Sequence, residues 1–308
     1  MKNFLVLLRA NAAPWAALLQ KALPQHSILT DAAAARGAVP YVLVGKPPAG
    51  ALAALPGLQV VFSINAGVEA LLDSAEVPVG LPIVRMVDDG LAEGMLEWVL
   101  ATVLAWHRNL FAYRALQLSG VWQDLHEVLA RDRRVTLLGA GHLGGRAAAA
   151  LAQIGFATRA WSRTPKQIAG VTCLSGPDQL DKAVEGSDFL INLLPLTPAT
   201  QDLIDDRLLS LLATGSVLIN GGRGRHVVDQ AVIDRLNRGH LRAAVLDVFR
   251  DEPLPAAHPF WRHPGVFITP HVAAPTHSAT AVAAIVENIK GYEAGAALMH
   301  LVDRVRGY

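Results

Sequence analysis

The pattern that most constrains this chain is an apolar run followed at once by closely spaced glycines and then by an alanine-rich stretch. Val135–Leu138 is apolar, residues 139–144 read GAGHLG, and Arg146–Leu151 is rich in alanine. This order predicts a buried strand, a tight turn and a helix whose N-terminus faces the phosphates of a dinucleotide. Glycines in this spacing are weak evidence alone, and the flanking strand and helix patterns make them strong. The residues that we expect to hold the dinucleotide here are Gly139, Gly141, His142, Leu143 and Gly144.

The residues that end the next predicted strand indicate which dinucleotide is bound. About 20 residues after the first glycine, NAD sites usually place a carboxylate that binds the ribose 2′-hydroxyl. This chain instead has Ser162, Arg163 and Thr164 there. A planar guanidinium and two hydroxyls suit a 2′-phosphate, which a carboxylate would repel. We therefore predict NADPH as the preferred cofactor, with NADH possible.

Short apolar runs alternate with helical patterns through most of the 308 residues, which is typical of parallel sheets covered by helices. Near residue 90 this alternation gives way to one long helical pattern, Ala92–Leu116. A last helix, about Ala279–Ala294, is expected to return to the first domain. We therefore predict an α/β fold of two domains: a substrate domain of residues 1–92 plus 281–308, and a dinucleotide-binding domain of residues 93–280.

The apolar runs predict ten strands. They are Phe4–Leu8, Tyr41–Val44, Leu58–Phe62, Pro82–Arg85, Arg134–Gly139, Thr158–Ser162, Phe189–Leu194, Ser216–Asn220, Ala243–Val248 and Val266–Thr269.

Composition excludes several classes of partner. The chain has 27 basic and 26 acidic side chains, and this near-neutral balance offers no field for nucleic acid or an anionic membrane. Cys173 is the one cysteine, so no internal disulfide can form, which fits a reducing, cytoplasmic setting. The apolar run at Phe4–Leu8 is too short for a signal peptide, and no run is long enough to span a membrane. The eleven histidines show no metal-binding spacing, so we expect no metal.

Three later segments carry groups that suit the reduction of a 2-keto acid. Arg223 follows one predicted strand, Glu252 follows the next, and His271 follows the last. An arginine binds a carboxylate with two parallel hydrogen bonds and polarises the ketone. A histidine suits protonation of the ketone oxygen as hydride from the cofactor reaches the carbon. A carboxylate beside that histidine orients the ring and favours its protonated form.

Taken together, these segments resemble the D-isomer-specific 2-hydroxyacid dehydrogenase family over nearly the whole chain. Residues 161–163 (WSR), 225–229 (RHVVD) and 268–274 (ITPHVAA) look most like its glyoxylate/hydroxypyruvate reductase branch. The resemblance implies a flavodoxin-like substrate domain, a Rossmann-type cofactor domain, an active-site cleft between them and a homodimer. It also implies a small 2-keto acid as substrate.

The resemblance adds further site residues to those read from the glycine motif. Residues 194–200 are similar to the family's cofactor loop, and residues 65–68 to its substrate loop of backbone donors. The cofactor residues implied in this way are Leu194, Pro195, Thr200, Gly221, Gly222, Asp247 and Ala273. The substrate residues implied are Gly45, Ala66 and Gly67, together with Arg223 and His271.

Some residues depart from the family pattern and leave alternatives open. Gly45 stands about where related reductases carry a bulky aromatic residue, which would widen the pocket. Lys46 is either a solvated loop lysine or attracts a second negative group. Trp122 belongs either to an arm that reaches a partner subunit or to the core. The alternative functions are a broader 2-keto-acid reductase for pyruvate-like or bulkier substrates and, more distantly, a dinucleotide-sensing scaffold.

Overall fold

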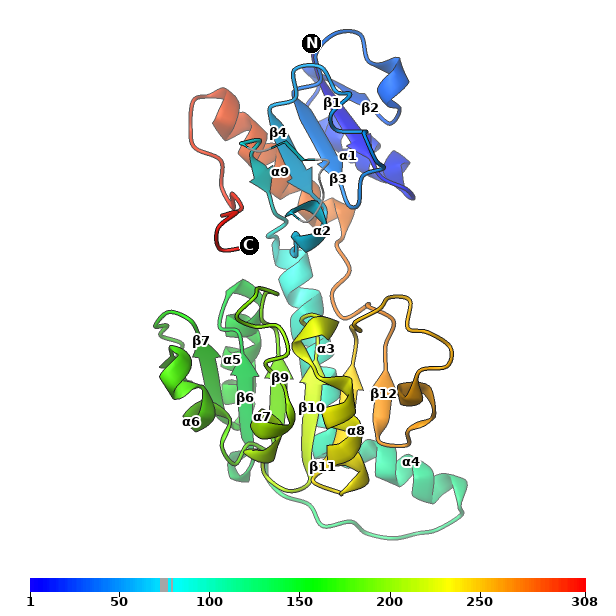
Figure 1. Cartoon of the computed structure of the whole chain (residues 1–308), viewed down its shortest axis with the longest axis vertical. Helices are drawn as coiled ribbons and strands as arrows, with labels where there is room; N and C mark the ends of the chain where they lie inside the picture. The colour runs from blue at the N-terminus through cyan, green and yellow to red at the C-terminus, as the bar shows by residue number, and fades with distance from the viewer. Residues whose placement is uncertain (73–76, 79) are drawn as a thin grey trace. The chain divides into compact units, whose positions relative to one another are not determined.

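The structure, a computed structural model, describes residues 1–72, 77–78 and 80–308. The chain forms two compact units, residues 1–91 with 276–308 and residues 92–275 (Figure 1). Each unit contains its own parallel sheet with helices packed on it. The predicted α/β class with two domains is therefore confirmed.

The first unit holds a five-stranded sheet in the order β2-β1-β3-β4-β5, with every neighbouring pair parallel. This is the strand order of flavodoxin-like folds, as expected. Its strands are β1 (Lys2–Leu7), β2 (His26–Leu29), β3 (Tyr41–Val44), β4 (Val60–Ser63) and β5 (Ile83–Val84), and its helices are α1 (Ala12–Ala22), α2 (Glu69–Leu72) and α9 (Ser278–Glu293). Every residue of the central strands β3 and β4 is buried, because helices and loops cover both faces of the sheet.

The end of the chain extends this sheet. Leu301 forms an antiparallel bridge with Val84, and the Val302 amide donates to the Ile83 carbonyl at 2.8 Å. Helix α9 packs against α1, and residues 276–308 belong to the same unit as residues 1–91.

The second unit holds a seven-stranded parallel sheet in the order β12-β11-β10-β9-β6-β7-β8. This is the Rossmann order with one added strand, β12, at its edge. The strands are β6 (Arg134–Leu138), β7 (Ala157–Ser162), β8 (Thr172–Ser175), β9 (Phe189–Asn192), β10 (Ser216–Asn220), β11 (Leu241–Leu246) and β12 (Val266–Ile268). Leu138 pairs with Asn192 and Asn220 pairs with Leu246, so the carboxyl ends of neighbouring strands lie level.

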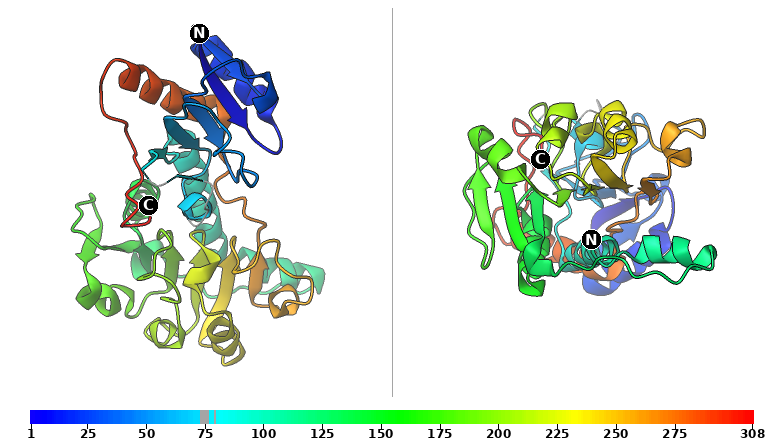
Figure 2. Two further views of the ribbon diagram at one scale, coloured as in Figure 1. Left: turned by 45° about the horizontal axis from the view of Figure 1, so that its top comes forward. Right: turned by 90° about the horizontal axis from the view of Figure 1, so that it is seen from below.

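Helices cover both faces of this sheet (Figure 2). On one face, α3 and α5 contribute side chains such as Val99 and Leu151 to one apolar cluster. On the other face, α6, α7 and α8 contribute Val184, Leu208 and Val232 to a second cluster. The helices are α3 (Asp89–His107), α4 (Leu110–Leu118), α5 (His142–Ile154), α6 (Leu180–Val184), α7 (Asp206–Ser210) and α8 (Asp229–Asn237).

The single long helix expected over Ala92–Leu116 is wrong in one respect, because the structure has two helices there. Asn109 separates α3 from α4 in the left-handed conformation, with φ of 56°. Asparagine adopts this conformation more readily than most residues. Its side-chain oxygen also accepts a hydrogen bond from Arg242 at 2.8 Å, which fixes the break in place. Within the described part of the chain, no helix has the length and apolar character needed to cross a membrane.

Candidate active site

Six of the predicted site segments follow strands of the second unit's sheet at their carboxyl ends. Because all seven strands are parallel, these segments lie along one edge of the sheet, where open α/β sheets bind their ligands. They are residues 139–144 after β6, 162–164 at the end of β7, 194–200 after β9, 221–223 after β10, 247–252 after β11 and 269–273 after β12.

The glycine turn between β6 and α5 has the close packing that its spacing predicts. Gly139 has φ of 103°, and a Cβ added at Gly144 would lie 1.8 Å from the Gly139 carbonyl oxygen. A Cβ at Gly141, by contrast, would meet no described atom within 4 Å, so the backbone there is open to a ligand. Gly141 caps α5 without a side-chain hydrogen bond, which leaves the first amides of the helix to bind phosphate. These residues fit the pyrophosphate of a dinucleotide.

At the end of β7, the three residues predicted to bind a 2′-phosphate differ in exposure. Arg163 and Thr164 are exposed, whereas Ser162 is 9% exposed. The Ser162 hydroxyl donates to the Thr164 carbonyl at 2.8 Å, so its proton is used within the loop. Arg163 and Thr164 are therefore the residues of this segment that lie at the surface.

His271 and Glu252 form a hydrogen-bonded pair. The His271 Nδ1 atom lies 2.7 Å from Glu252 Oε2, and the other carboxylate oxygen accepts from the Phe249 amide at 2.9 Å. The imidazole is thus oriented through Nδ1, while 53% of the His271 side chain is exposed. Its backbone has φ of 55°, a left-handed conformation that residues other than glycine seldom adopt. Residues held in such rare backbone conformations cluster at functional sites.

Asp247 holds the segment that carries His271. Its side chain is buried, and its two oxygens accept hydrogen bonds from the Thr269 hydroxyl at 2.6 Å and from the Val272 and Ala273 amides at 2.9 and 3.0 Å. The Asp247 carbonyl also accepts from the His271 amide at 2.8 Å. One buried carboxylate and its own backbone therefore fix the turn on which the exposed imidazole stands.

In the first unit, the predicted substrate residues follow two neighbouring strands. Gly45 comes directly after β3, and Ala66 and Gly67 come shortly after β4. A Cβ at Gly45 would lie 3.1 Å from Ile64 Cδ1, so these two strand ends are close together. Lys46 beside them is exposed. The structure thus gathers the predicted substrate residues of this unit at one edge of its own sheet.

Comparison with known proteins places the chain in a family. A family model described as D-isomer specific 2-hydroxyacid dehydrogenase, NAD binding domain, matches residues 100–273. A protein of Yersinia enterocolitica named glyoxylate/hydroxypyruvate reductase A is 42% identical over 303 residues, which cover 97% of each chain. The chain belongs to the D-isomer specific 2-hydroxyacid dehydrogenase family. The sequence resemblance is confirmed, including the branch, and the chain is an oxidoreductase of this class.

Two solved structures of this family share the fold of the whole chain. A 2-hydroxyacid dehydrogenase from Xanthobacter autotrophicus Py2, solved with NADPH and MES, is 37% identical with a TM-score of 0.95, covering 100% of this chain and 99% of that one. An NADPH-dependent glyoxylate/hydroxypyruvate reductase from Sinorhizobium meliloti, solved with NADP and sulfate, is 36% identical with a TM-score of 0.93 and covers 100% of both chains.

The sequence analysis of this dehydrogenase missed three buried polar residues next to Arg223. Asn192, Asn220 and His226 are each fully buried. Asn192 Nδ2 donates to Asn220 Oδ1 at 2.8 Å and lies 2.8 Å from His226 Nδ1. The sequence does carry a signal for two of them, because the apolar strands β9 and β10 end on Asn192 and Asn220 at the ligand-binding edge. A buried amide at such a position needs hydrogen-bond partners.

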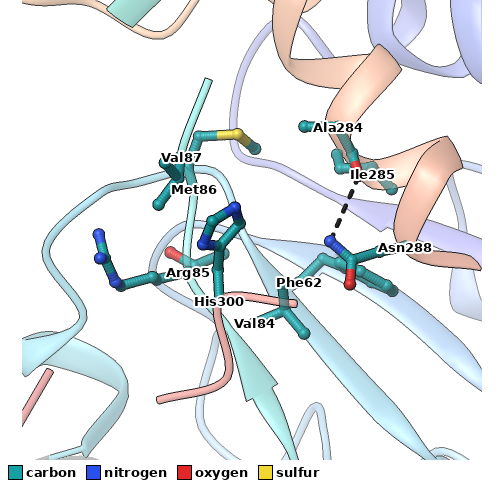
Figure 3. Close-up of a pocket in the computed structure, with 10 residues that line it drawn as sticks. Phe62, Val84, Arg85, Met86, Val87, Ala284, Ile285, Asn288 and His300 are labelled. Carbon is teal, nitrogen blue, oxygen red and sulfur yellow. Dashed lines mark hydrogen bonds between the residues drawn. The ribbon is translucent and has the colours of Figure 1, made fainter. Parts of the chain in front are cut away.

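Two hollows of this dehydrogenase differ in what they could hold. One, of about 420 Å³, lies against the Glu252–His271 pair and is walled by apolar side chains that include Leu254, Trp261 and Ile268. The other lies in the first unit beside Arg85, Asn288 and His300 (Figure 3) and has about 10 Å³ of free volume, room for about one water. The second hollow is therefore too small for a 2-keto acid. Among the described residues, no group of three or more acidic, histidine or cysteine side chains is arranged to hold a metal.

Proposed function

We propose that this 2-hydroxyacid dehydrogenase uses NADPH to reduce a small 2-keto acid of the glyoxylate or hydroxypyruvate type to the 2-hydroxy acid. The observation that carries the proposal is the Glu252–His271 pair, which stands at the same sheet edge as the glycine turn. Names of relatives support the substrate class, since several are called glyoxylate/hydroxypyruvate reductase A. The working setting that we propose is the cytoplasm.

Each group of the site has a definite part in this reaction. Arg223 binds the substrate carboxylate and polarises the ketone. Bound NADPH supplies the hydride. As hydride reaches the keto carbon, His271 gives a proton from Nε2 to the keto oxygen, and the product is the hydroxy acid. Glu252 keeps Nδ1 hydrogen-bonded, so it orients the ring and stabilises the charged imidazole before transfer.

The cofactor site that we propose combines the glycine turn with the loops along the same edge. The amides of α5 bind the pyrophosphate, and Arg163 with Thr164 binds the 2′-phosphate. The residues assigned to the nicotinamide end and to the loops around it are Leu194, Pro195, Thr200, Gly221, Gly222, Asp247 and Ala273. NADH is expected to work less well, because its 2′-hydroxyl gives the guanidinium no anion to bind.

The second candidate is a reductase with broader substrate range. The feature that favours it is Gly45, which carries no side chain at a position assigned to the substrate pocket; Ile64 Cδ1, 3.1 Å from where a Cβ would stand, fills part of that space with an apolar group. A keto acid with a longer side chain would gain apolar contact there.

A panel of keto acids tests the proposal. NADPH oxidation would be followed with glyoxylate, hydroxypyruvate, pyruvate and longer 2-keto acids, and kcat/KM compared. The highest values for glyoxylate or hydroxypyruvate would support the narrow function, and equal or higher values for longer acids would support the broader one. No oxidation with any 2-keto acid would contradict both and favour a dinucleotide-sensing scaffold.

A further inference from the structure

We infer that His226 is a positioning residue that fixes the backbone of Arg223 and ties it to the loop after β9 through a neutral imidazole of one tautomer. This inference rests on the role proposed above for Arg223. His226 is fully buried. None of its described hydrogen bonds goes to Glu252 or His271.

The hydrogen-bond partners of His226 determine its tautomer. His226 Nε2 lies 3.2 Å from the Pro195 carbonyl oxygen, which only accepts, so Nε2 carries the proton. His226 Nδ1 faces two donors, the Arg223 amide at 3.2 Å and the Asn192 Nδ2 group at 2.8 Å. An acceptor is needed there, so Nδ1 carries no proton and the ring is neutral.

Two buried side chains, His226 and Asn220, bind the backbone of Arg223. The Arg223 amide donates to His226 Nδ1, and the Arg223 carbonyl accepts from Asn220 Nδ2 at 3.1 Å. Both backbone groups of Arg223 are thereby bound to buried side chains. Since the backbone of Arg223 is extended, with φ of −138° and ψ of 147°, fixing these two groups fixes the direction in which its side chain leaves the chain.

The chain on either side of Arg223 is tightly packed. A Cβ at Gly222 would lie 2.9 Å from Asn192 Nδ2, and a Cβ at Gly224 would lie 1.9 Å from the Phe249 carbonyl carbon. The residues on either side of Arg223 therefore lie against other groups and leave little room for the turn to shift. In such a closed polar network, each member depends on the others being satisfied.

The network also crosses from β10 to β9. His226 reaches the Pro195 carbonyl, and Asn192 Oδ1 accepts from the Leu194 amide at 3.3 Å. Leu194 and Pro195 belong to the loop assigned to the cofactor. One imidazole thus holds the carboxylate-binding arginine with Nδ1 and the cofactor loop with Nε2.

Substitution can test the contributions of Nδ1 and Nε2 separately. In His226→Asn, the side-chain oxygen replaces Nδ1 as the acceptor attached to Cγ, and the donor to Pro195 is lost. In His226→Gln, the amide nitrogen can still reach toward Pro195, and the acceptor at the Nδ1 position is lost. We expect His226→Gln to lower kcat/KM for the keto acid about 10- to 100-fold, with the dissociation constant of NADPH within about threefold of wild type. We expect His226→Asn to recover most of that loss in kcat/KM.

A double-mutant cycle with Arg223→Ala shows whether His226 acts through Arg223. If it does, adding His226→Gln to Arg223→Ala causes less than about a twofold further loss in kcat/KM. A full further loss in the double mutant, or equal losses in the Asn and Gln single variants, would overturn the inference. Circular dichroism and NADPH binding report whether each variant is folded. If Arg223→Ala alone leaves kcat/KM unchanged, the proposed role of Arg223 fails, and with it this inference; a large effect of Arg223→Ala with additive effects of His226→Gln refutes the inference alone.

Discussion

Arg163 is the side chain on which the proposed preference for NADPH depends most directly. It is exposed at the end of β7 beside Thr164, while the nearby Ser162 hydroxyl is used within the loop. Arg163→Glu should raise KM for NADPH about 10- to 100-fold, because it exchanges a charge-assisted hydrogen bond for repulsion. KM for NADH should change little. Steady-state kinetics with both cofactors measures this.

Arg238, directly after the C-terminal end of α8, provides a matched control for the substitution of Arg163. Arg238 is also exposed and follows that helix, away from the sheet edge that carries the glycine turn. Arg238→Glu makes the same change in net charge and should leave both KM values near those of wild type. Equal rises for NADPH and NADH in Arg163→Glu would argue against a contact with the 2′-phosphate.

The sequence could indicate candidate reactive side chains but not their surroundings. Arg223, Glu252 and His271 are predicted as catalytic residues because each follows an apolar run in the order that the chemistry needs. The left-handed backbone of His271 and the three bonds to the Asp247 carboxylate were not predictable, since they depend on how β11 and β12 lie side by side. The burial of His226 was not predictable, because nothing in the local sequence marks a histidine as buried.

At the level of the elements, adjacent glycines of α5 should respond differently to the same change. A Cβ at Gly144 would lie 1.8 Å from the Gly139 carbonyl oxygen, whereas the nearest described atom to a Cβ at Gly145 is 3.7 Å away. Gly144→Ala should therefore force α5 away from β6, lower the free energy of unfolding by about 1–3 kcal/mol or more, and weaken NADPH binding.

Gly145→Ala is the control, and it should be neutral or stabilise by up to about 1 kcal/mol, because alanine favours a helix more than glycine does. Urea unfolding of both variants, together with NADPH titration, tests the difference. Equal stability of the two variants would show that the turn does not depend on close packing at Gly144.

Glu293, at the end of α9, joins that helix to three strands of the first unit. Burial alone would raise the pKa of its carboxyl, but hydrogen bonds from Lys2, His26 and Tyr41 at 2.9, 3.0 and 3.0 Å outweigh this and hold the pKa below its usual value. A carboxyl whose pKa is lowered on folding contributes stability above its unfolded pKa, near 4.3, and loses it as the pH falls further.

Glu293→Gln should therefore lower the free energy of unfolding by about 1–3 kcal/mol at neutral pH, and the difference from wild type should shrink as the pH falls below about 4.3. Chemical unfolding at several pH values measures it. The exposed Glu287 on the same helix provides a control, Glu287→Gln. A difference that stays constant with pH would contradict a charged Glu293 in the folded state.

The elements that were not predicted lie mainly at the edges of the sheets. β2 and β8 each have four residues, of which one is buried. Such strands lack the continuous apolar run that marks β3, β4, β9 and β10, because one side of an edge strand needs no neighbour. The break at Asn109 was missed because the apolar helical period continues on both sides of it.

For the molecule as a whole, the segment from α4 to residue 129 carries apolar side chains on the surface. In Figures 1 and 2, α4 and the chain after it extend from the rest of the second unit. Leu118 is 73% exposed and Trp122 is 99% exposed, so Trp122 is not part of the core of its own chain. Apolar groups gathered on one segment in this way suit a partner surface, and a second copy of the chain is the partner that we propose.

Trp122→Asp combined with Leu118→Asp should shift the molar mass in solution from that of two chains to that of one, because the charges cannot be buried at an interface. Light scattering after size-exclusion chromatography measures this. Val305 is equally exposed in the first unit, so Val305→Asp is the control and should leave the mass unchanged. A wild-type chain that runs as a monomer, or a double variant that stays a dimer, would contradict an interface at this segment.

The most direct measurement is the rate constant of NADPH oxidation in a single turnover with saturating 2-keto acid, compared between the wild type and His271→Ala. The Glu252–His271 pair predicts that this rate constant falls about 10²- to 10⁴-fold when the proton donor is removed, while NADPH binds with unchanged affinity. An unchanged rate constant in His271→Ala would contradict His271 as the group that protonates the keto oxygen.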